Sequence, residues 1–264
     1  MNIDITSFSN PKIKNLGKLL DKKKERDKQA LIIIEGKAEI ELACQNGVKI
    51  KELFYSPELN DFDLYIKRKD FPVFTVSKQV FSKISYREGP DGFLAVAVNP
   101  KKEKLSKLKI SSKPLVVILE GVEKPGNLGA VLRTADASGT DAVIINQERT
   151  DIYNPNVIRS SLGTVFSNQV VGASIQETSS WLKSNNISVV ATVVDAKKEY
   201  TEVDFSKGVA ILMGEENRGL SEDWKKRADE KVSIPMKGKI NSLNISVSAA
   251  VIIYEALKQR TKKN

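Results

Sequence analysis

Polar side chains follow two apolar runs near the carboxyl end of the sequence. The run Val209–Met213 stops at Gly214 and the carboxylate Glu215, and a shorter run ending at Ile234 is followed by Pro235-Met236. Short apolar runs of this kind are typical of buried parallel strands. Because open α/β sheets bind ligands at the carboxyl ends of their strands, we expect a binding site where these two runs end.

The segment 120–135, EGVEKPGNLGAVLRTA, could also bind a ligand, but it matches neither common phosphate-binding motif. A P-loop requires Lys and then Ser or Thr after Gly126, where this chain has Asn127-Leu128, so nucleotide hydrolysis is not expected. The dinucleotide pattern G-x-G-x-x-G is absent as well. Asn127 is expected at a helix N-terminus, with Arg133 about two turns, or roughly 9 Å, further along. Alone, these two would be a plain helix cap and a member of a surface or interface ion pair.

Three motifs, taken together, resemble those of the SpoU (TrmH-type) RNA 2′-O-ribose methyltransferases of the SPOUT class. Their order and spacing make a far stronger signal than any single motif. The resemblance is closest over residues 115–260. The matching residues are Asn127 with Arg133-Thr134-Ala135, Met213-Gly214-Glu215 with Gly219-Leu220, and Ile234-Pro235-Met236 with Ser242-Leu243-Asn244-Ile245-Ser246.

The resemblance implies methyl transfer from S-adenosyl-L-methionine to a ribose 2′-hydroxyl. This reaction needs the nucleophile, methyl carbon and sulfur in line, and a group that takes the proton of a very weak acid. The chain has no histidine, and a guanidinium is normally fully protonated. Arg133 could therefore be the base, or could anchor the adjacent phosphate while a phosphate oxygen or Glu215 takes the proton. The implied catalytic residues are Asn127, Arg133, Glu215, Ser242 and Asn244.

The resemblance also implies a cofactor pocket built largely from backbone. The implied cofactor-binding positions are Thr192, Gly214, Ile234, Met236 and Leu243. Gly214 would leave room for a ligand against the backbone, and the three apolar side chains would enclose the adenine. The same three side chains could equally be ordinary core residues.

Composition sets further limits. The 264 residues are 41% hydrophobic, enough for one large or two modest domains. A formal net charge of +9 fits nucleic-acid binding, and equally a solvated basic surface.

The absence of histidine removes the commonest metal ligand, so no metal is expected. The single cysteine precludes an internal disulfide and fits the cytoplasm. No apolar run approaches the ~20 residues needed to cross a membrane.

The first 100 residues predict a small α/β domain that binds RNA. Residues 10–30 have the apolar spacing of one amphipathic helix, and its basic residues could track a phosphate backbone or simply face solvent. The candidates are Lys12, Lys14, Lys22 and Arg26. Strands are expected at 31–34, 50–55, 71–76 and 93–98, with helices at 36–45 and 79–84. Glu35-Gly36 and residues 90–95 are similar to the substrate-binding domain often fused in front of SpoU catalytic domains.

The second half alternates strands and helices, which predicts a mainly parallel sheet covered on both faces. Besides the runs named above, strands are expected at 115–119, 142–145, 166–170 and 188–194, and helices at 128–138, 157–162, 175–185 and 245–260. The resemblance implies a SPOUT fold with a deep C-terminal trefoil knot, and a homodimer through the C-terminal domain. We therefore expect an RNA-binding domain at 1–100, a linker at 101–113 and a methyltransferase domain at 114–264.

Some alternatives remain open. Large-subunit (23S) ribosomal RNA is favoured over tRNA, because in the family an added N-terminal domain is commonest in enzymes that modify it. Methylation of a base at carbon 5 would need a thiolate, and Cys44 lies on the apolar side of a predicted front-domain helix, where we interpret it as a core residue. A non-catalytic RNA-binding protein with this fold is less favoured, since every polar motif position is present.

Overall fold

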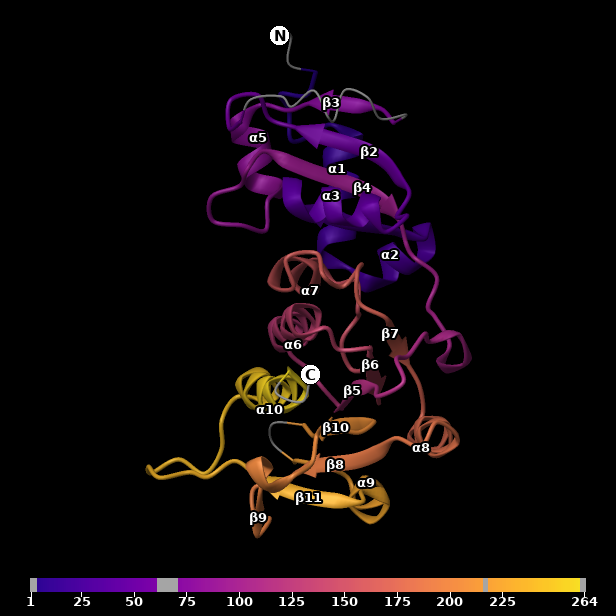
Figure 1. Ribbon diagram of the computed structural model, residues 1–264. Coiled ribbons are helices and arrows are strands. Elements are labelled where there is room, and N and C mark those ends of the chain that lie inside the picture. Colours follow the sequence, from indigo (N-terminus) through magenta and orange to yellow (C-terminus); the bar gives the residue numbers. More distant parts are fainter. Residues whose placement is uncertain (1–3, 61–70, 216–217, 262–264) are drawn as a thin grey trace. The chain divides into compact units, whose positions relative to one another are not determined.

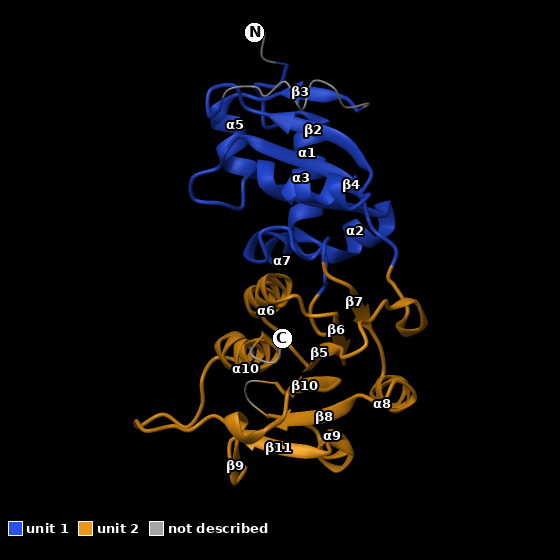
Figure 2. Cartoon of the chain, viewed as in Figure 1, with its two compact units in different colours: residues 1–101, 151–167 blue, residues 102–150, 168–264 orange. Residues whose placement is uncertain are grey.

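The structure, a computed structural model, describes residues 4–60, 71–215 and 218–261. The chain forms two compact units, which Figure 2 shows in separate colours. Unit 1 contains residues 1–101 and 151–167, and unit 2 contains residues 102–150 and 168–264. Segment 151–167 thus clusters with unit 1 although both of its flanking segments belong to unit 2. Its helix α7 (Pro155–Ser160) packs against strand β1 (Leu31–Glu35) of unit 1.

Unit 1 is built on a mixed sheet of strand order β1-β4-β2-β3. The remaining strands are β2 (Ile50–Tyr55), β3 (Val73–Thr75) and β4 (Phe93–Val98). β4 is antiparallel to both β1 and β2, and β3 is parallel to β2. Helices α1 (Pro11–Asp21) and α5 (Lys78–Ile84) share one apolar cluster with the sheet, and α3 (Lys37–Gln45) packs against β1 and β4. The small α/β domain predicted from the sequence is present.

The predicted single helix at 10–30 is instead two helices, α1 and α2 (Lys23–Gln29). Lys22 between them is extended, with φ −118° and ψ 110°. The guanidinium of Arg26 donates to the carbonyl oxygens of Leu19 and Leu20, at 2.7 and 3.2 Å. These bonds satisfy carbonyls at the end of α1 that a continuing helix would have satisfied itself, which allows the chain to break here.

Unit 2 is built on a sheet of strand order β7-β6-β5-β10-β8-β11-β9, and every pairing in it is parallel. The strands are β5 (Leu115–Glu120), β6 (Ala142–Asn146), β7 (Val170–Gly172), β8 (Ser188–Thr192), β9 (Lys198–Glu199), β10 (Val209–Met213) and β11 (Glu230–Ser233). The parallel sheet predicted from the alternation is confirmed. β7 begins four residues later than expected, and β9 was not anticipated.

Helices cover both faces of this sheet, as predicted (Figure 1). α6 (Pro125–Ser138) and α10 (Ile245–Thr261) pack together on one face. α8 (Ile175–Ser184) and α9 (Glu222–Arg227) lie on the other, where the buried Trp224 joins the apolar cluster. Short 3-10 turns at Leu105–Lys107 and Tyr200–Glu202 complete the unit. In the part of the chain described, no helix is long and apolar enough to cross a membrane.

Candidate active site

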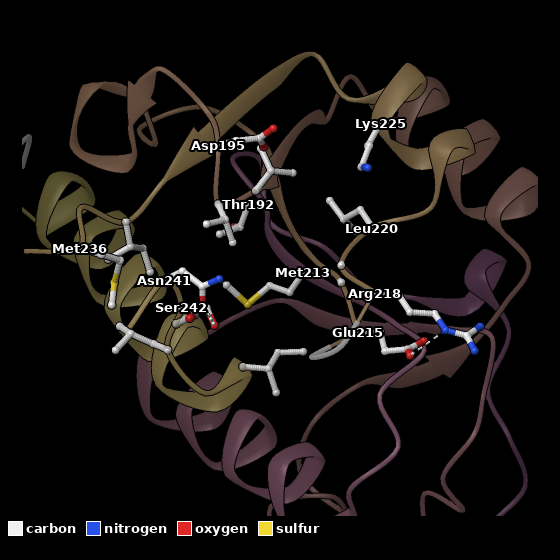
Figure 3. Close-up of a pocket in the computed structure, with 18 residues that line it drawn as sticks. Thr192, Asp195, Met213, Glu215, Arg218, Leu220, Lys225, Met236, Asn241 and Ser242 are labelled. Atoms are coloured by element: carbon white, nitrogen blue, oxygen red, sulfur yellow. Dashed lines mark hydrogen bonds and ion pairs between the residues drawn. The ribbon is translucent and has the colours of Figure 1, made fainter. Parts of the chain in front are cut away.

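A cavity of about 420 Å³ opens in unit 2 where β8, β10 and β11 end (Figure 3). This volume lies within the range of small-molecule sites, ~300–1,000 Å³. Its walls come from the segments after these three strands, from α9 and from the start of α10. The expectation of a pocket at this edge of the sheet is thus met by the geometry. The lining residues are those of 192–195, 213–215, 218–220 and 241–243, with Lys225, Ile234, Met236, Ile245 and Ser248, whereas Asn244 does not line the cavity.

All five positions implied for the cofactor line this one cavity: Thr192, Gly214, Ile234, Met236 and Leu243. The three apolar side chains are each partly exposed, as cavity walls are, rather than fully buried core. The hydroxyl Oγ1 of Thr192 is buried and has no hydrogen-bond partner within the described parts of the chain. An unsatisfied buried hydroxyl costs about 1–3 kcal/mol, so a ligand atom that bonds it here would be favoured. The residues present therefore fit a largely apolar ligand with polar groups.

Gly214 lines the cavity, and the structure gives a further reason for a glycine at this position. A Cβ placed on it would lie 2.3 Å from the carbonyl carbon of Gly219 and 2.5 Å from the backbone nitrogen of Leu220. The loop after β10 folds back on itself, and Gly219 donates its N–H to the carbonyl of Glu215 at 2.8 Å. Because Gly214 has no side chain, the backbone of Gly219 and Leu220 can pack directly against it. This close approach allows the turn and so shapes the cavity.

Glu215 is held between two guanidinium groups. Its carboxylate lies 2.9 Å from Nη1 of Arg149 and 3.7 Å from Nε of Arg218, and its side chain is only 11% exposed. Arg149 also pairs with Glu123 at 2.5 Å. The hydrogen bond to Glu123 and the charge of Glu215 raise the pKa of Arg149, which therefore remains charged. The pairing fixes the position of Glu215 at the cavity wall.

Asn127 and Asn244 meet directly, although 117 positions separate them in the sequence. Nδ2 of Asn244 donates to Oδ1 of Asn127 at 3.2 Å. Asn244 also accepts from the backbone N–H of Ser246 at 2.9 Å, so it caps α10. Asn127 does not cap α6: Lys124 is the N-cap, and Asn127 lies in the first turn. The interpretation of Asn127 as a plain helix cap is therefore wrong, and the residue instead ties α6 to the start of α10.

Ser242 and Arg133 differ in their relation to the cavity. Ser242 lines it and is exposed. Arg133 lies on the exposed side of α6 and does not line the cavity. Among the described residues, no ion pair or hydrogen bond to its guanidinium is present. Its charge is therefore available to a phosphate or to another molecule.

Four charged residues of the site were not anticipated from the sequence. Asp195, Arg218 and Lys225 line the cavity, and Arg149 holds Glu215. Asp195 follows the end of β8, so the strand-end rule could have found it. Lys225 comes from α9, a short charged helix with no apolar repeat, and Arg149 comes from a loop distant in sequence. No pattern in the sequence around Lys225 or Arg149 predicted that they lie at the site.

The four basic residues proposed for RNA lie in different environments. Lys14 and Lys22 are exposed. Lys12 pairs with Glu52 and lies 4.3 Å from the ring centroid of Phe74. Arg26 is 2% exposed, and its guanidinium is bonded within unit 1. The expectation that Arg26 contacts RNA is therefore wrong, and the residue has a structural role. Its Nη2 pairs with Asp151 at 2.7 Å.

Two further expectations concern cysteine and metal. Cys44 is half-buried on α3, rather than fully inside the core as interpreted. It lies in unit 1, whereas the cavity belongs to unit 2. Across residues 4–60, 71–215 and 218–261, no group of three or more histidine, cysteine, aspartate or glutamate side chains could hold a metal ion.

Two family models match the chain. Residues 114–254 match the SpoU rRNA Methylase family, and residues 10–95 match the MRM3-like substrate binding domain. A 23S rRNA (guanosine(2553)-2′-O)-methyltransferase, RlmP of Bacillus subtilis, is 30% identical over 95% of this chain and 97% of its own length. A 23S rRNA (uridine(2479)-2′-O)-methyltransferase of Streptomyces viridochromogenes is 29% identical over 92% and 88%.

Solved structures agree with these relatives. A crystal structure of an RNA 2′-O ribose methyltransferase is similar with a TM-score of 0.88 and 42% identity, over 97% of this chain and 99% of that chain. The SpoU methyltransferase AviRb from Streptomyces viridochromogenes, in complex with the cofactor AdoMet, is similar with a TM-score of 0.85 and 26% identity, over 96% and 98%.

Proposed function

The chain belongs to the SpoU rRNA methylase family, and on this premise we propose that it transfers a methyl group from S-adenosyl-L-methionine to a ribose 2′-hydroxyl of 23S rRNA. One observation carries the proposal: all five implied cofactor positions line one cavity, which Glu215 and Ser242 also line. The 23S target is favoured because the two full-length relatives described above are named for that RNA.

The cavity residues bind and orient the two substrates. S-adenosyl-L-methionine, when bound, supplies an electrophilic methyl group on a sulfonium. Ile234, Met236 and Leu243 would contact its adenine, and the unpaired hydroxyl of Thr192 would accept or donate one hydrogen bond to it. Proximity in such a pocket supplies much of the rate, because the nucleophile and the methyl carbon are already aligned.

Arg133 is proposed to anchor the RNA. Its exposed guanidinium can donate two parallel hydrogen bonds to the phosphate beside the target ribose, which positions the 2′-hydroxyl. Glu215 or a phosphate oxygen would take the proton. The ion pairs with Arg149 and Arg218 hold the carboxylate of Glu215 in place at the cavity wall.

Because Arg133 lies outside the cavity, its anchoring role requires that RNA or a second copy of the chain complete the site. We propose a homodimer through the C-terminal domain. Val247 and Tyr254 of α10, 48% and 49% exposed, provide apolar surface for such an interface. We also propose a deep trefoil knot, which follows from family membership. The division at 1–100, 101–113 and 114–264 rests on the resemblance and on the polar segment that joins the two parts, and a cytoplasmic location rests on the single cysteine.

A substitution at Thr192 tests the cofactor site. Thr192→Val keeps the shape of the side chain and removes the unsatisfied hydroxyl, so it should stabilise the free protein by about 1 kcal/mol. The same change should weaken S-adenosyl-L-methionine binding about 5- to 10-fold in calorimetry, because one hydrogen bond is lost. No heat signal at millimolar cofactor with the folded parent protein would contradict the proposed function. Unchanged affinity in the variant would contradict only the role of Thr192.

A further inference from the structure

Two aromatic rings of unit 1 are exposed, and each lies beside a cation. Tyr86 is 51% exposed and Phe8 is 37% exposed. The guanidinium of Arg159 lies 5.5 Å from the ring centroid of Tyr86, and the ammonium of Lys83 lies 4.6 Å from that of Phe8. Lys83 and Tyr86 are three residues apart, at the end of α5 and just beyond it. We call these four residues the ring–cation surface.

A buried carboxylate accepts hydrogen bonds from the backbone at Tyr86. Glu35, at the end of β1, is 5% exposed. Its Oε2 accepts the N–H of Tyr86 at 2.7 Å, and its Oε1 accepts from the hydroxyl of Ser85 and, at 3.4 Å, from the N–H of Arg87. Arg87 in turn pairs with Glu39. One carboxylate thus bonds three successive residues, so the backbone at Tyr86 is held by hydrogen bonds while its side chain is exposed.

The segment that carries Phe8 is anchored at Ile5 to the end of β3. Ile5, three residues earlier, is buried and forms a parallel bridge with Val76, the residue after β3. The N–H of Ile5 donates to the carbonyl of Thr75 at 3.0 Å. Both exposed rings therefore leave well-anchored backbone, and neither ring joins the apolar cluster formed by α1, α5 and the sheet.

We propose that the ring–cation surface binds unpaired bases of the RNA substrate by stacking. The inference rests on the proposed function, since it names the surface that holds the RNA whose ribose is methylated. Stacking on an aromatic or guanidinium plane requires a base that is free of its pair, and a nearby cation neutralises the adjoining phosphate. A rigid exposed ring loses little entropy when a base stacks on it, which makes Tyr86 suited to this role.

The charges around the surface favour RNA over a protein partner. The exposed cations Lys83 and Arg159 lie beside the rings, and Lys78 is exposed at the start of α5. The exposed acids near these residues include Glu88, in the loop that follows Tyr86, and Glu58, whose Oε2 accepts the N–H of Lys78 at 2.6 Å. The chain as a whole carries a net charge of +9. Two exposed rings, each beside a cation, match the chemistry with which single-strand binders hold bases and phosphates.

The test uses the full-length protein and a fluorescein-labelled 12-nucleotide RNA of mixed sequence, single-stranded or annealed to its complement. Tyr86→Leu should raise the Kd for the single strand about 5- to 100-fold, because one stacked base is lost, and should change the Kd for the duplex by less than about 2-fold. Tyr86→Phe keeps the ring and should bind like the parent protein. Phe8→Leu should weaken single-strand binding in the same direction.

Salt dependence separates the ring from the cation. Lys83→Gln should reduce the slope of log Kd against log salt concentration by roughly 0.7 for single strands, whereas Tyr86→Leu should leave that slope unchanged. Equal losses on duplex and single strand, or parent-like binding by Tyr86→Leu, would overturn the inference. If Tyr86→Leu lost binding only to ribosomal particles and not to free RNA, the occupant would be a protein. Normal cofactor binding alongside any of these results would leave the proposed function intact.

Discussion

Replacing Gly214 by Ala should deform the cofactor cavity without unfolding the protein. The added Cβ would lie 2.3 Å from the carbonyl carbon of Gly219 and 2.5 Å from the nitrogen of Leu220. Ordinary contacts between carbon atoms begin near ~3.5 Å, so this backbone must retreat by about 1 Å. Overpacking of this kind costs about 1–3 kcal/mol. Because Gly219 and Leu220 line the cavity, the displacement also changes the site.

The expected result is a drop in Tm of about 2–10 °C and an affinity for S-adenosyl-L-methionine about 10- to 100-fold weaker. Scanning calorimetry and titration calorimetry measure the two quantities on the same sample. Gly17→Ala in α1 is the matched control, because a Cβ there meets nothing within 4 Å, and it should raise stability by up to ~1 kcal/mol. If Gly214→Ala bound the cofactor as tightly as the parent at the same Tm, the close approach of the loop would play no part in shaping the site.

Three further substitutions test other parts of the account. Arg133→Lys should lower the single-turnover methylation rate by about 10²–10³, almost as much as Arg133→Ala, because a point charge cannot replace the planar fork. The affinity for the cofactor should stay unchanged. An active Lys variant would show that Arg133 is only an ion-pair residue. Arg149→Gln should lower the methylation rate by freeing Glu215, with cofactor affinity altered less than about 3-fold, and an unchanged rate would show that Glu215 needs no anchor. Trp224→Phe should lower the free energy of unfolding, measured in urea, by about 2–4 kcal/mol, because it opens a cavity and leaves Oδ1 of Asn146 without its 3.0 Å donor. A loss below about 1 kcal/mol would contradict the importance of this buried bond.

The strand ends that form the site could be predicted from the sequence because each signal is local. The apolar run Val209–Met213 and the glycine after it show where a buried strand stops, and the polar residues that follow are adjacent in sequence. The parallel sheet then brings such ends to one edge, so the ends of β10 and β11 meet at one cavity. Thr192 and Leu243, which line the same cavity, were expected there only because of the resemblance to the family.

Features that depend on contacts between distant segments could not be predicted. The role of Gly214 follows from the returning loop, and the break at Lys22 follows from the position of the Arg26 guanidinium. Phe166 has the residue type of a strand, yet it stacks on Tyr153 with 6.0 Å between ring centroids, in the segment 151–167 that clusters with unit 1. Apolar periodicity records that a side chain is buried, and it does not say against which part of the chain.

The most direct test of the central claim is the chemical position of the transferred methyl group. The protein would be incubated with S-adenosyl-L-methionine carrying a labelled methyl group and with 23S rRNA from cells that lack this protein, and the RNA would be digested to nucleosides for mass spectrometry. We predict that the label appears in one nucleoside, on the ribose, and that the adjacent phosphodiester resists alkaline hydrolysis because its 2′-hydroxyl is blocked. Label on a base, or no transfer by folded protein that binds the cofactor, would contradict the assignment.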